Sequence, residues 1–213
     1  MIDSEIAAKD WLRTLPECNG PAMDRLERLV ALLTKENDRQ NLVSAASLPT
    51  VWQRHIADSA QLLCHVPRET DSPWLDLGTG AGFPGLVIAA LRPDCEMVMV
   101  ESRGLRTDWL ESAKAALALN NAVVVPAQLE QLETRHMQVI SARAFAPLNR
   151  LLKLSARFST GDTLWLLPKG RSARQELQDL RGWNHLFHVE QSLTDGDAGL
   201  IVGKLIGNKG RKQ

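Results

Sequence analysis

The stretch WLDLGTGAGFPG, residues 74–85, places four glycines and a proline directly behind a short apolar run. Glycines after a first buried strand let the backbone turn sharply and approach a ligand closely. A helix that follows such a turn offers unpaired N–H groups and the positive end of its dipole to an anionic group. The stretch therefore predicts a ligand-binding turn between a strand and a helix of an α/β sheet.

Two ligand classes fit such a turn, and the register of the glycines against the strand separates them. Gly80, Gly82 and Gly85 satisfy the dinucleotide fingerprint G-x-G-x-x-G, but this match starts two residues beyond Gly78, where the turn begins. Asp76 followed by Gly78, Gly80 and Gly82 fits without offset, and this order is typical of S-adenosylmethionine-dependent methyltransferases. The pattern favours a methyltransferase over a nicotinamide-dependent oxidoreductase, with a glycine turn that holds no ligand as the remaining alternative.

Short apolar runs alternate with helical stretches through the rest of the chain. Predicted strands cover residues 74–77, 95–101, 122–126, 137–144, 162–170, 185–193 and 198–207, and predicted helices cover 84–92, 106–120, 147–158 and 171–182. Alternating strands and helices predict a parallel sheet with helices on both faces. The turn-rich TDGD between the last two strands predicts an antiparallel hairpin. This order is similar to the Rossmann-like fold of class I methyltransferases, with a seven-stranded, mostly parallel sheet.

The first 66 residues lack this alternation of strands and helices, and their helical spacing predicts an N-terminal helical extension. Met23, Leu26, Leu29, Val30 and Leu33 recur at helical spacing on one face. Pro67 and the polar residues after it interrupt this pattern. We expect residues 1–66 to pack on residues 67–213, the domain that carries the glycine turn, as one compact unit.

Composition excludes several classes of protein. The N-terminus lacks a signal peptide and no apolar run spans a bilayer, which predicts a cytoplasmic protein without a membrane partner. The three cysteines form no C-x-x-C pair, and the histidines lack ligand spacing apart from the weak His185/His188 pair, so we expect no metal site. The net charge is zero, but residues 1–100 carry a net charge of −5 and residues 101–213 one of +5. A basic C-terminal half that ends in GNKGRKQ suits a polyanionic partner.

Five motifs together resemble one family. They are RHIADS (54–59), LDLGTGAGFPG (75–85), ESRGLRTDWL (101–110), ISARAFAPL (140–148) and LLPKG (166–170). Over roughly residues 37–182 the chain resembles the bacterial ribosomal RNA small subunit methyltransferase G family. The resemblance implies methyl transfer from S-adenosylmethionine to N7 of a guanine in the decoding-region loop of 16S rRNA. The partner would be 16S rRNA in the small ribosomal subunit or its assembly intermediate, and no obligate protein partner is evident.

The motifs also define the expected site. Glu101, at the end of the second strand, is suited to accept two ribose hydroxyls, and the resemblance assigns Arg143 to positioning in the methyl-transfer pocket. The expected cofactor-binding residues are Asp76, Gly78, Gly80, Phe83, Glu101, Leu129, Glu130 and Arg143. The expected RNA contacts are Arg54, His55, Lys169, Arg171 and Arg174, and the family signature on the N-terminal helices also includes Asn41, Asp58 and Ser59.

The expected chemistry requires no catalytic acid or base. Guanine N7 has an in-plane lone pair and no proton, so it can attack a sulfonium methyl directly. The sequence accordingly offers no Ser/His/Asp or Cys/His pattern for nucleophilic catalysis. Leu105 and Gln138 stand where the family pattern has Lys and Asp. A methyltransferase for another substrate and a non-catalytic nucleotide-binding regulatory protein are the alternative functions.

Overall fold

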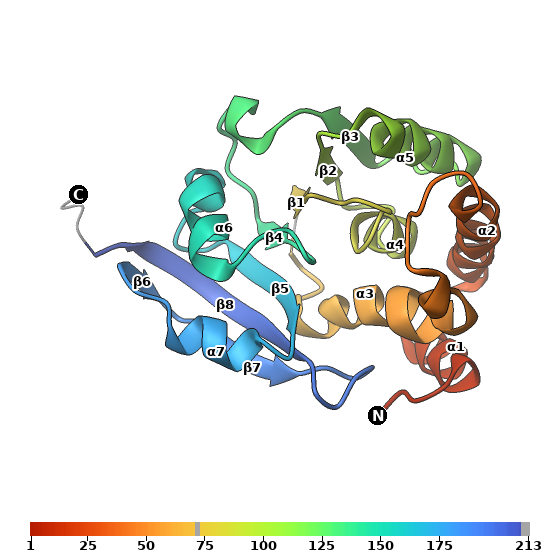
Figure 1. The fold of residues 1–213 in the computed structure, drawn as a ribbon, viewed down its shortest axis with the longest axis horizontal. Coiled ribbons are helices and arrows are strands. Elements are labelled where there is room, and N and C mark those ends of the chain that lie inside the picture. The colour runs from red at the N-terminus through yellow and green to blue at the C-terminus, as the bar shows by residue number, and fades with distance from the viewer. Residues whose placement is uncertain (71–72, 210–213) are drawn as a thin grey trace.

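The computed structural model describes residues 1–70 and 73–209 of the chain, and its centre is one mixed β-sheet (Figure 1). The strands are β1 (Trp74–Leu77), β2 (Met97–Glu101), β3 (Ala122–Pro126), β4 (Val139–Ser141), β5 (Leu164–Gly170), β6 (Trp183–His185), β7 (His188–Gln191) and β8 (Gly199–Asn208). Their order is β3-β2-β1-β4-β5-β8-β6, with β7 also paired to β8. The first five strands are parallel and β8 is antiparallel to β5, as the sequence predicts.

Eight strand segments occupy seven positions, because β6 and β7 pair with the same edge of β8. The strand predicted over residues 185–193 is therefore shortened to β7 at 188–191, and β6 at 183–185 lies almost wholly before the predicted range. The break lies opposite Gly203, whose φ is +145° and where a Cβ atom would lie 2.3 Å from the Leu186 carbonyl oxygen. The close backbone approach at this glycine displaces the neighbouring strand, as glycine in a strand commonly does.

Helices cover both faces of the sheet (Figure 1). One face carries α4 (Gly85–Leu91), α5 (Gly104–Ala116) and the N-terminal extension, and the other carries α6 (Leu148–Ser155) and α7 (Ala173–Gln178). The extension contains α1 (Glu5–Thr14), α2 (Gly20–Asn37), the 3₁₀ turn η1 (Ala45–Thr50), the π turn η2 (Trp52–Ala57), α3 (Asp58–Ala60) and the 3₁₀ turn η3 (Gln61–His65). Two further 3₁₀ turns, η4 (Leu129–Gln131) and η5 (Ala156–Phe158), follow β3 and α6.

Alternation along the strands supplies both cores, because successive side chains of a strand point to opposite faces. Trp74 and Met97 join the cluster beneath the N-terminal helices, whereas the next residues, Leu75 and Val98, join the cluster beneath α6 and α7. The strands are therefore apolar on both faces, as expected for a parallel sheet covered by helices. None of the helices in residues 1–70 and 73–209 is long and apolar enough to cross a membrane.

The N-terminal extension shares its core with the sheet. Leu26, Leu29 and Leu33 of α2 are fully buried in the same cluster as Leu91 of α4 and Met97 of β2. Polar side chains at both starts support the first two helices: Ser4 accepts a hydrogen bond from the Ala7 amide, and Asn19 accepts one from the Ala22 amide. This shared core makes the extension part of the folded unit that positions the site.

We predict that the whole chain unfolds in one cooperative transition and that Leu29→Ala destabilises all of it by about 2–5 kcal/mol, the usual cost of truncating a buried leucine. Urea unfolding followed by both tryptophan fluorescence and far-UV circular dichroism measures this change. Ile6→Ala, on an exposed part of α1, is the control and should change stability little. Separate transitions for the two probes would contradict the single unit.

Candidate functional site

A buried carboxylate holds the glycine turn from below. Asp76 is fully buried, and its Oδ2 accepts hydrogen bonds from the Thr79 hydroxyl at 2.7 Å and the Gly85 amide at 3.0 Å. Its Oδ1 accepts one from Ser141 of β4 at 2.8 Å. Burial raises the pKa of this carboxyl and the hydrogen bonds oppose that rise. Asp76, predicted as a cofactor contact, therefore shapes the turn through its interior bonds and exposes no atom to a ligand.

The upper side of the turn is bare backbone. Three of its residues have positive φ, namely Gly78 (+64°), Gly80 (+60°) and Gly82 (+100°). A Cβ atom at Gly78 would lie 2.4 Å from the Phe145 ring, so Phe145 packs directly on the turn. This approach is possible only because residue 78 has no side chain.

Glu101 lies at the end of β2, as predicted, and the structure places it beside the turn. Its Oε2 accepts a hydrogen bond from the Gly80 amide at 3.0 Å, and its Oε1 accepts from the Ser102 and Arg103 amides. The Arg103 guanidinium donates to both carboxylate oxygens, at 3.0 and 3.1 Å. Burial opposes ionisation of Glu101, but the bonds from Arg103 and Gly80 outweigh it and lower its pKa.

This arrangement fits S-adenosylmethionine. The paired N–H groups of Arg103 donate to the two oxygens that would accept the two ribose hydroxyls, and 65% of the Arg103 side chain is exposed, so a ribose at these oxygens would take the place of Arg103. Glu101 is charged and aimed at the turn, as a ribose acceptor requires. Leu129 and Glu130 begin η4 after β3: the first is buried in the core and the second is exposed at the same edge of the sheet.

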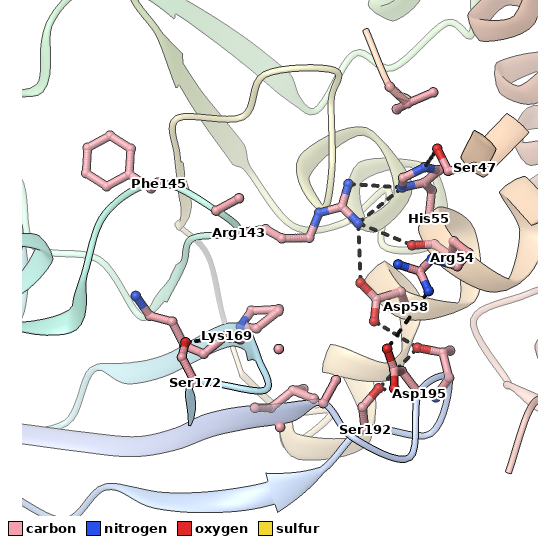
Figure 2. Close-up of a pocket in the computed structure, with 18 of the residues that line it drawn as sticks. Ser47, Arg54, His55, Asp58, Arg143, Phe145, Lys169, Ser172, Ser192 and Asp195 are labelled. Atoms are coloured by element: carbon pink, nitrogen blue, oxygen red, sulfur yellow. Dashed lines mark hydrogen bonds and ion pairs between the residues drawn. The ribbon is translucent and has the colours of Figure 1, made fainter. Parts of the chain in front are cut away.

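A cavity of about 780 Å³ is lined by His55, Arg143 and Phe145, side chains that contact Phe83 or Gly78 of the glycine turn (Figure 2). Four segments far apart in the sequence line it: the N-terminal helices, the loop after β4, the loop after β5 and the loop between β7 and β8. Its volume lies within the range of small-molecule sites. The carboxyl ends of β4 and β5 face it, which is where open α/β sheets bind ligands.

Arg143 spans the wall of this cavity from the loop after β4 to η2. Its Nη1 and Nη2 both lie 3.2 Å from His55 Nδ1, and Nη1 lies 3.3 Å from both the Arg54 carbonyl oxygen and Asp58 Oδ2. Figure 2 shows the guanidinium reaching between His55 and Asp58. The guanidinium also lies 5.2 Å from the centre of the Phe83 ring, within cation–π range.

His55 is held as a neutral imidazole. An arginine only donates hydrogen bonds, so Nδ1 must be an acceptor, and the ring proton is on Nε2, which donates to Ser47 Oγ at 2.9 Å. Burial, then the charges of Arg143 and Arg54, lower the pKa of His55 to about 3. Its ring stacks on Phe83, with centroids 5.1 Å apart and planes inclined by 14°. Phe83, predicted as a cofactor contact, is only 2% exposed and places its ring against the N-terminal helices.

The Ser47–His55 pair is an arrangement that the sequence did not predict. It is not an activated nucleophile, because the Ser47 hydroxyl donates to the Ser44 carbonyl oxygen at 2.8 Å and His55 presents its proton to Ser47. Nδ1 meets a cation rather than the carboxylate of a catalytic triad. In addition, no group of three metal-binding side chains occurs among the residues that the structure describes.

The predicted RNA contacts separate into two groups. The Lys169 side chain is only 8% exposed, with Nζ 2.5 Å from the Ala146 carbonyl oxygen and 3.0 Å from Glu176 Oε2, so the structure gives it partners other than the predicted phosphate. Arg54 and Arg171 have side chains 56% and 80% exposed, and their ion-pair partners are acids of the loop between β7 and β8. Arg174 is also exposed.

The remaining signature residues have structural contacts. Asn41 is exposed and its carbonyl oxygen accepts a hydrogen bond from Arg106, and buried Ser59 donates to the His55 carbonyl oxygen at 2.6 Å. Leu105, one of the departures from the family pattern, is 70% exposed at the start of α5. The tail residues Arg211 and Lys212 lie outside the described residues.

Sequence reasoning missed four residues of the site, which are Ser47, Arg103, Phe145 and Glu176. Arg103 offered one signal, its place two residues after the predicted ribose acceptor. Glu176 offered none, since its pairing with Lys169 depends on how α7 packs beside β5.

The sheet order, the glycine turn and the acid after β2 define a class I S-adenosylmethionine-dependent methyltransferase. A solved structure of a SAM-dependent methyltransferase from Aquifex aeolicus has this fold, with a TM-score of 0.57 and 14% identity over 74% of this chain and 93% of that one. The particular family follows from the sequence: residues 22–195 match rRNA small subunit methyltransferase G. The chain belongs to this family.

Curated relatives named ribosomal RNA small subunit methyltransferase G agree with this match. The relative from Erythrobacter litoralis is 61% identical over 96% of this chain and 98% of its own length. The relative from Novosphingobium aromaticivorans is 58% identical over 97% of this chain and 90% of its own length. The chain is therefore an S-adenosylmethionine-dependent methyltransferase of small-subunit rRNA.

We predict that Glu101→Ala weakens S-adenosylmethionine binding by about 1.5–3 kcal/mol, the range for hydrogen bonds to a charged group. Arg103→Ala is the matched variant, because it removes the other member of the same ion pair. It should leave the affinity unchanged or increase it, since the carboxylate no longer has to release Arg103. Isothermal titration calorimetry on both variants gives the comparison, and equal weakening in both would mean that the pair only supports the turn.

A second prediction concerns the free energy of unfolding and pH. The folded pKa of His55 is about 3 against an ordinary value of 6.5, so below pH 6.5 the unfolded chain binds more protons and stability falls as the pH falls toward 3. The charged groups that face the ring are Arg143 from the loop after β4 and Arg54 and Asp58 from its own helical segment. The loss is about 1.4 kcal/mol per pH unit, or about 2 kcal/mol at pH 5.

His55→Asn, which cannot titrate, should remove this part of the pH dependence. Urea unfolding of both proteins at about pH 7.5 and about pH 5 measures the difference, and contributions from other histidines cancel in the comparison. Parallel stability profiles for the two proteins would show that His55 is not held neutral.

Proposed function

We propose that this protein transfers the methyl group of S-adenosylmethionine to N7 of a guanine in the decoding-region loop of 16S rRNA. Family membership supports the small-subunit rRNA as substrate. The observation that carries the assignment of the site is the cavity of about 780 Å³, with Arg143 in its wall and the glycine turn beside it. The cavity is the place for the base, and the turn is the place for the methyl donor.

The chemistry supports N7 as the acceptor. The cofactor supplies an electrophilic methyl group on sulfur, and N7 of guanine already has the lone pair that the reaction needs. No proton has to leave the base, so no general base is required. The charged groups in the cavity wall fit this requirement, because Asp58 and Glu176 both accept hydrogen bonds and face arginine or lysine partners. The site thus contributes mainly by positioning, which has a ceiling of about 7–11 kcal/mol.

Arg143 is suited to orient the base. Arginine commonly donates to the O6 and N7 edge of guanine. Here N7 has to stay free for methyl transfer, so the guanidinium would donate to O6 alone. The base would enter the cavity out of its stack, as in other enzymes that modify bases. Asp58 balances the guanidinium charge from the opposite side, at 3.3 Å.

Exposed arginines near the cavity are suited to hold the RNA backbone. Arg54 belongs to the cavity wall, and Arg171 and Arg174 follow β5 directly beside it. Their exposure leaves the guanidinium groups accessible to phosphates, which arginine binds through paired N–H groups. Lys169 serves a different purpose in this proposal: it ties Glu176 to the loop that carries Arg143.

The test is to incubate the protein and labelled S-adenosylmethionine with small ribosomal subunits from cells that lack it. We expect label on one guanine of the decoding-region loop, released by the mild depurination and strand cleavage that N7-methylguanine permits. Free 16S rRNA and assembly intermediates, assayed in parallel, identify the preferred form of the substrate. Label on another RNA or on a protein would contradict the proposal, and cofactor binding without any transfer would favour a regulatory role.

A further inference from the structure

Arg143 belongs to a segment that does not restrain its side chain. Residues 142–147 join β4 to α6 without regular structure, and Ala144 in the middle has a φ of +53°. Among the residues that the structure describes, every hydrogen bond of the Arg143 guanidinium runs to the N-terminal helices, to His55, Asp58 and the Arg54 carbonyl. The orientation of this side chain is therefore fixed from outside the methyltransferase sheet.

We propose that His55 is the positioning residue for Arg143, acting as a neutral hydrogen-bond acceptor that fixes the guanidinium in the cavity wall. This inference rests on the proposed function, in which Arg143 contacts the base. In this inference His55 acts through Arg143 and not on the base itself. His55 holds Arg143 in place. Because His55 also stacks on Phe83, it fixes the position of Arg143 relative to the glycine turn.

The acceptor geometry supports this role. Two N–H groups of Arg143 converge on the single lone pair of His55 Nδ1, both at 3.2 Å. The opposite ring nitrogen donates to Ser47, and Ser47 donates to the Ser44 carbonyl oxygen, so the tautomer and the ring orientation are both fixed. A protonated ring could not accept these bonds and would place a second positive charge against Arg143.

Asp58 alone would not fix the guanidinium. Its Oδ1 already accepts hydrogen bonds from Gln61 at 2.8 Å and Thr194 at 2.9 Å, and its Oδ2 lies 3.3 Å from Arg143. A single contact between one guanidinium nitrogen and one carboxylate oxygen sets the distance between the two groups but leaves the orientation of the guanidinium free. His55 supplies the second point of attachment, on the other side of the guanidinium (Figure 2).

Phe83 links this support to the cofactor side. Its ring lies in the glycine turn, stacks on His55 at 5.1 Å and faces the Arg143 guanidinium at 5.2 Å. Because Phe83 is only 2% exposed, it has little freedom to move independently of its neighbours. One packed group of side chains thus includes the turn, the histidine and the arginine.

The experiment uses four full-length proteins: wild type, His55→Leu, Arg143→Ala and the double variant. Methyl transfer to small subunits gives kcat and KM, and calorimetry gives the S-adenosylmethionine affinity without RNA. We expect His55→Leu to lower kcat about 10- to 100-fold, the effect of losing a hydrogen bond to a charged group, with cofactor affinity within about threefold of wild type. In the Arg143→Ala background the same substitution should lower kcat no further.

Two more variants separate positioning from general structural support. His55→Asn keeps a side-chain acceptor near the Nδ1 position and should recover most of the activity that His55→Leu loses. His136→Leu, at an exposed histidine in the described loop before β4, is the control and should behave as wild type. If His55→Leu does not fold, Ser47→Ala provides the same test with a smaller expected loss of kcat. This substitution removes the hydroxyl that accepts the hydrogen bond from His55 Nε2, so the ring proton is no longer fixed on that nitrogen.

Additive losses in the double variant would overturn the inference, and so would Asn performing no better than Leu. A wild-type protein that methylates no small-subunit RNA would instead contradict the proposed function. The free energy of unfolding gives a readout independent of activity: His55→Leu should lower the urea midpoint less in the Arg143→Ala background than in wild type. Equal shifts in the two backgrounds would show that His55 does not act through Arg143.

Discussion

The buried carboxylate of Asp76 is the interaction on which the site depends. It joins three parts of the fold, because its oxygens accept hydrogen bonds from Thr79 and Gly85 of the glycine turn and from Ser141 of β4. Ser141 in turn accepts a hydrogen bond from the Trp74 indole at 2.9 Å. A buried acceptor without these donors would cost several kcal/mol, so the turn and the ends of β1 and β4 are held in one arrangement. This arrangement places Gly80 of the turn next to Glu101. It also fixes the end of β4, and Arg143 follows Ser141 by two residues.

The N-terminal extension completes the site that the sheet begins. The loop after β4 carries Arg143, but the acceptors that orient its guanidinium belong to η2 and α3. At the other end of the same loop, Lys169 contacts the Ala146 carbonyl, and Glu176 accepts a hydrogen bond from the Leu148 amide at 2.7 Å. The loop is thus fixed at both ends by side chains from other elements. This explains why the extension shares a core with the sheet: a loosely attached extension could not fix an arginine in the cavity wall.

Much of the fold was predictable because it depends on local periodicity. Apolar runs predicted the order of strands, the helical spacing of Leu26, Leu29 and Leu33 predicted a buried face, and Glu101 was correctly placed at the end of β2. The split between β6 and β7 was not predictable, since it depends on backbone contact between Gly203 and Leu186.

The site was predictable in its residue types more than in its contacts. Arg143 and His55 are 88 residues apart in the chain, and their pairing depends on how the extension packs. Lys169 was predicted to contact RNA because it lies at the end of the fifth predicted strand, where open α/β sheets bind ligands. Its burial follows from Glu176, which the packing of α7 brings within 3.0 Å. The tertiary structure determines which side chains of different elements pair. A sequence motif therefore identifies one residue of a pair but does not predict its partner.

The charged groups of the site are matched in a way that suits a reaction without proton transfer. Glu101 faces Arg103, Asp58 faces Arg143, Glu176 faces Lys169, and His55 is neutral. Such pairs add little to stability, because desolvation offsets much of the attraction between partly buried charges. Their value is geometric, since each pair fixes a long side chain that would otherwise move. A site that needed a general base would instead keep one titratable group unpaired, with a pKa near neutrality. The pairing of these three acids with three bases, beside a neutral His55, therefore agrees with catalysis by positioning, in which the methyl donor and the nucleophilic nitrogen supply the chemistry themselves.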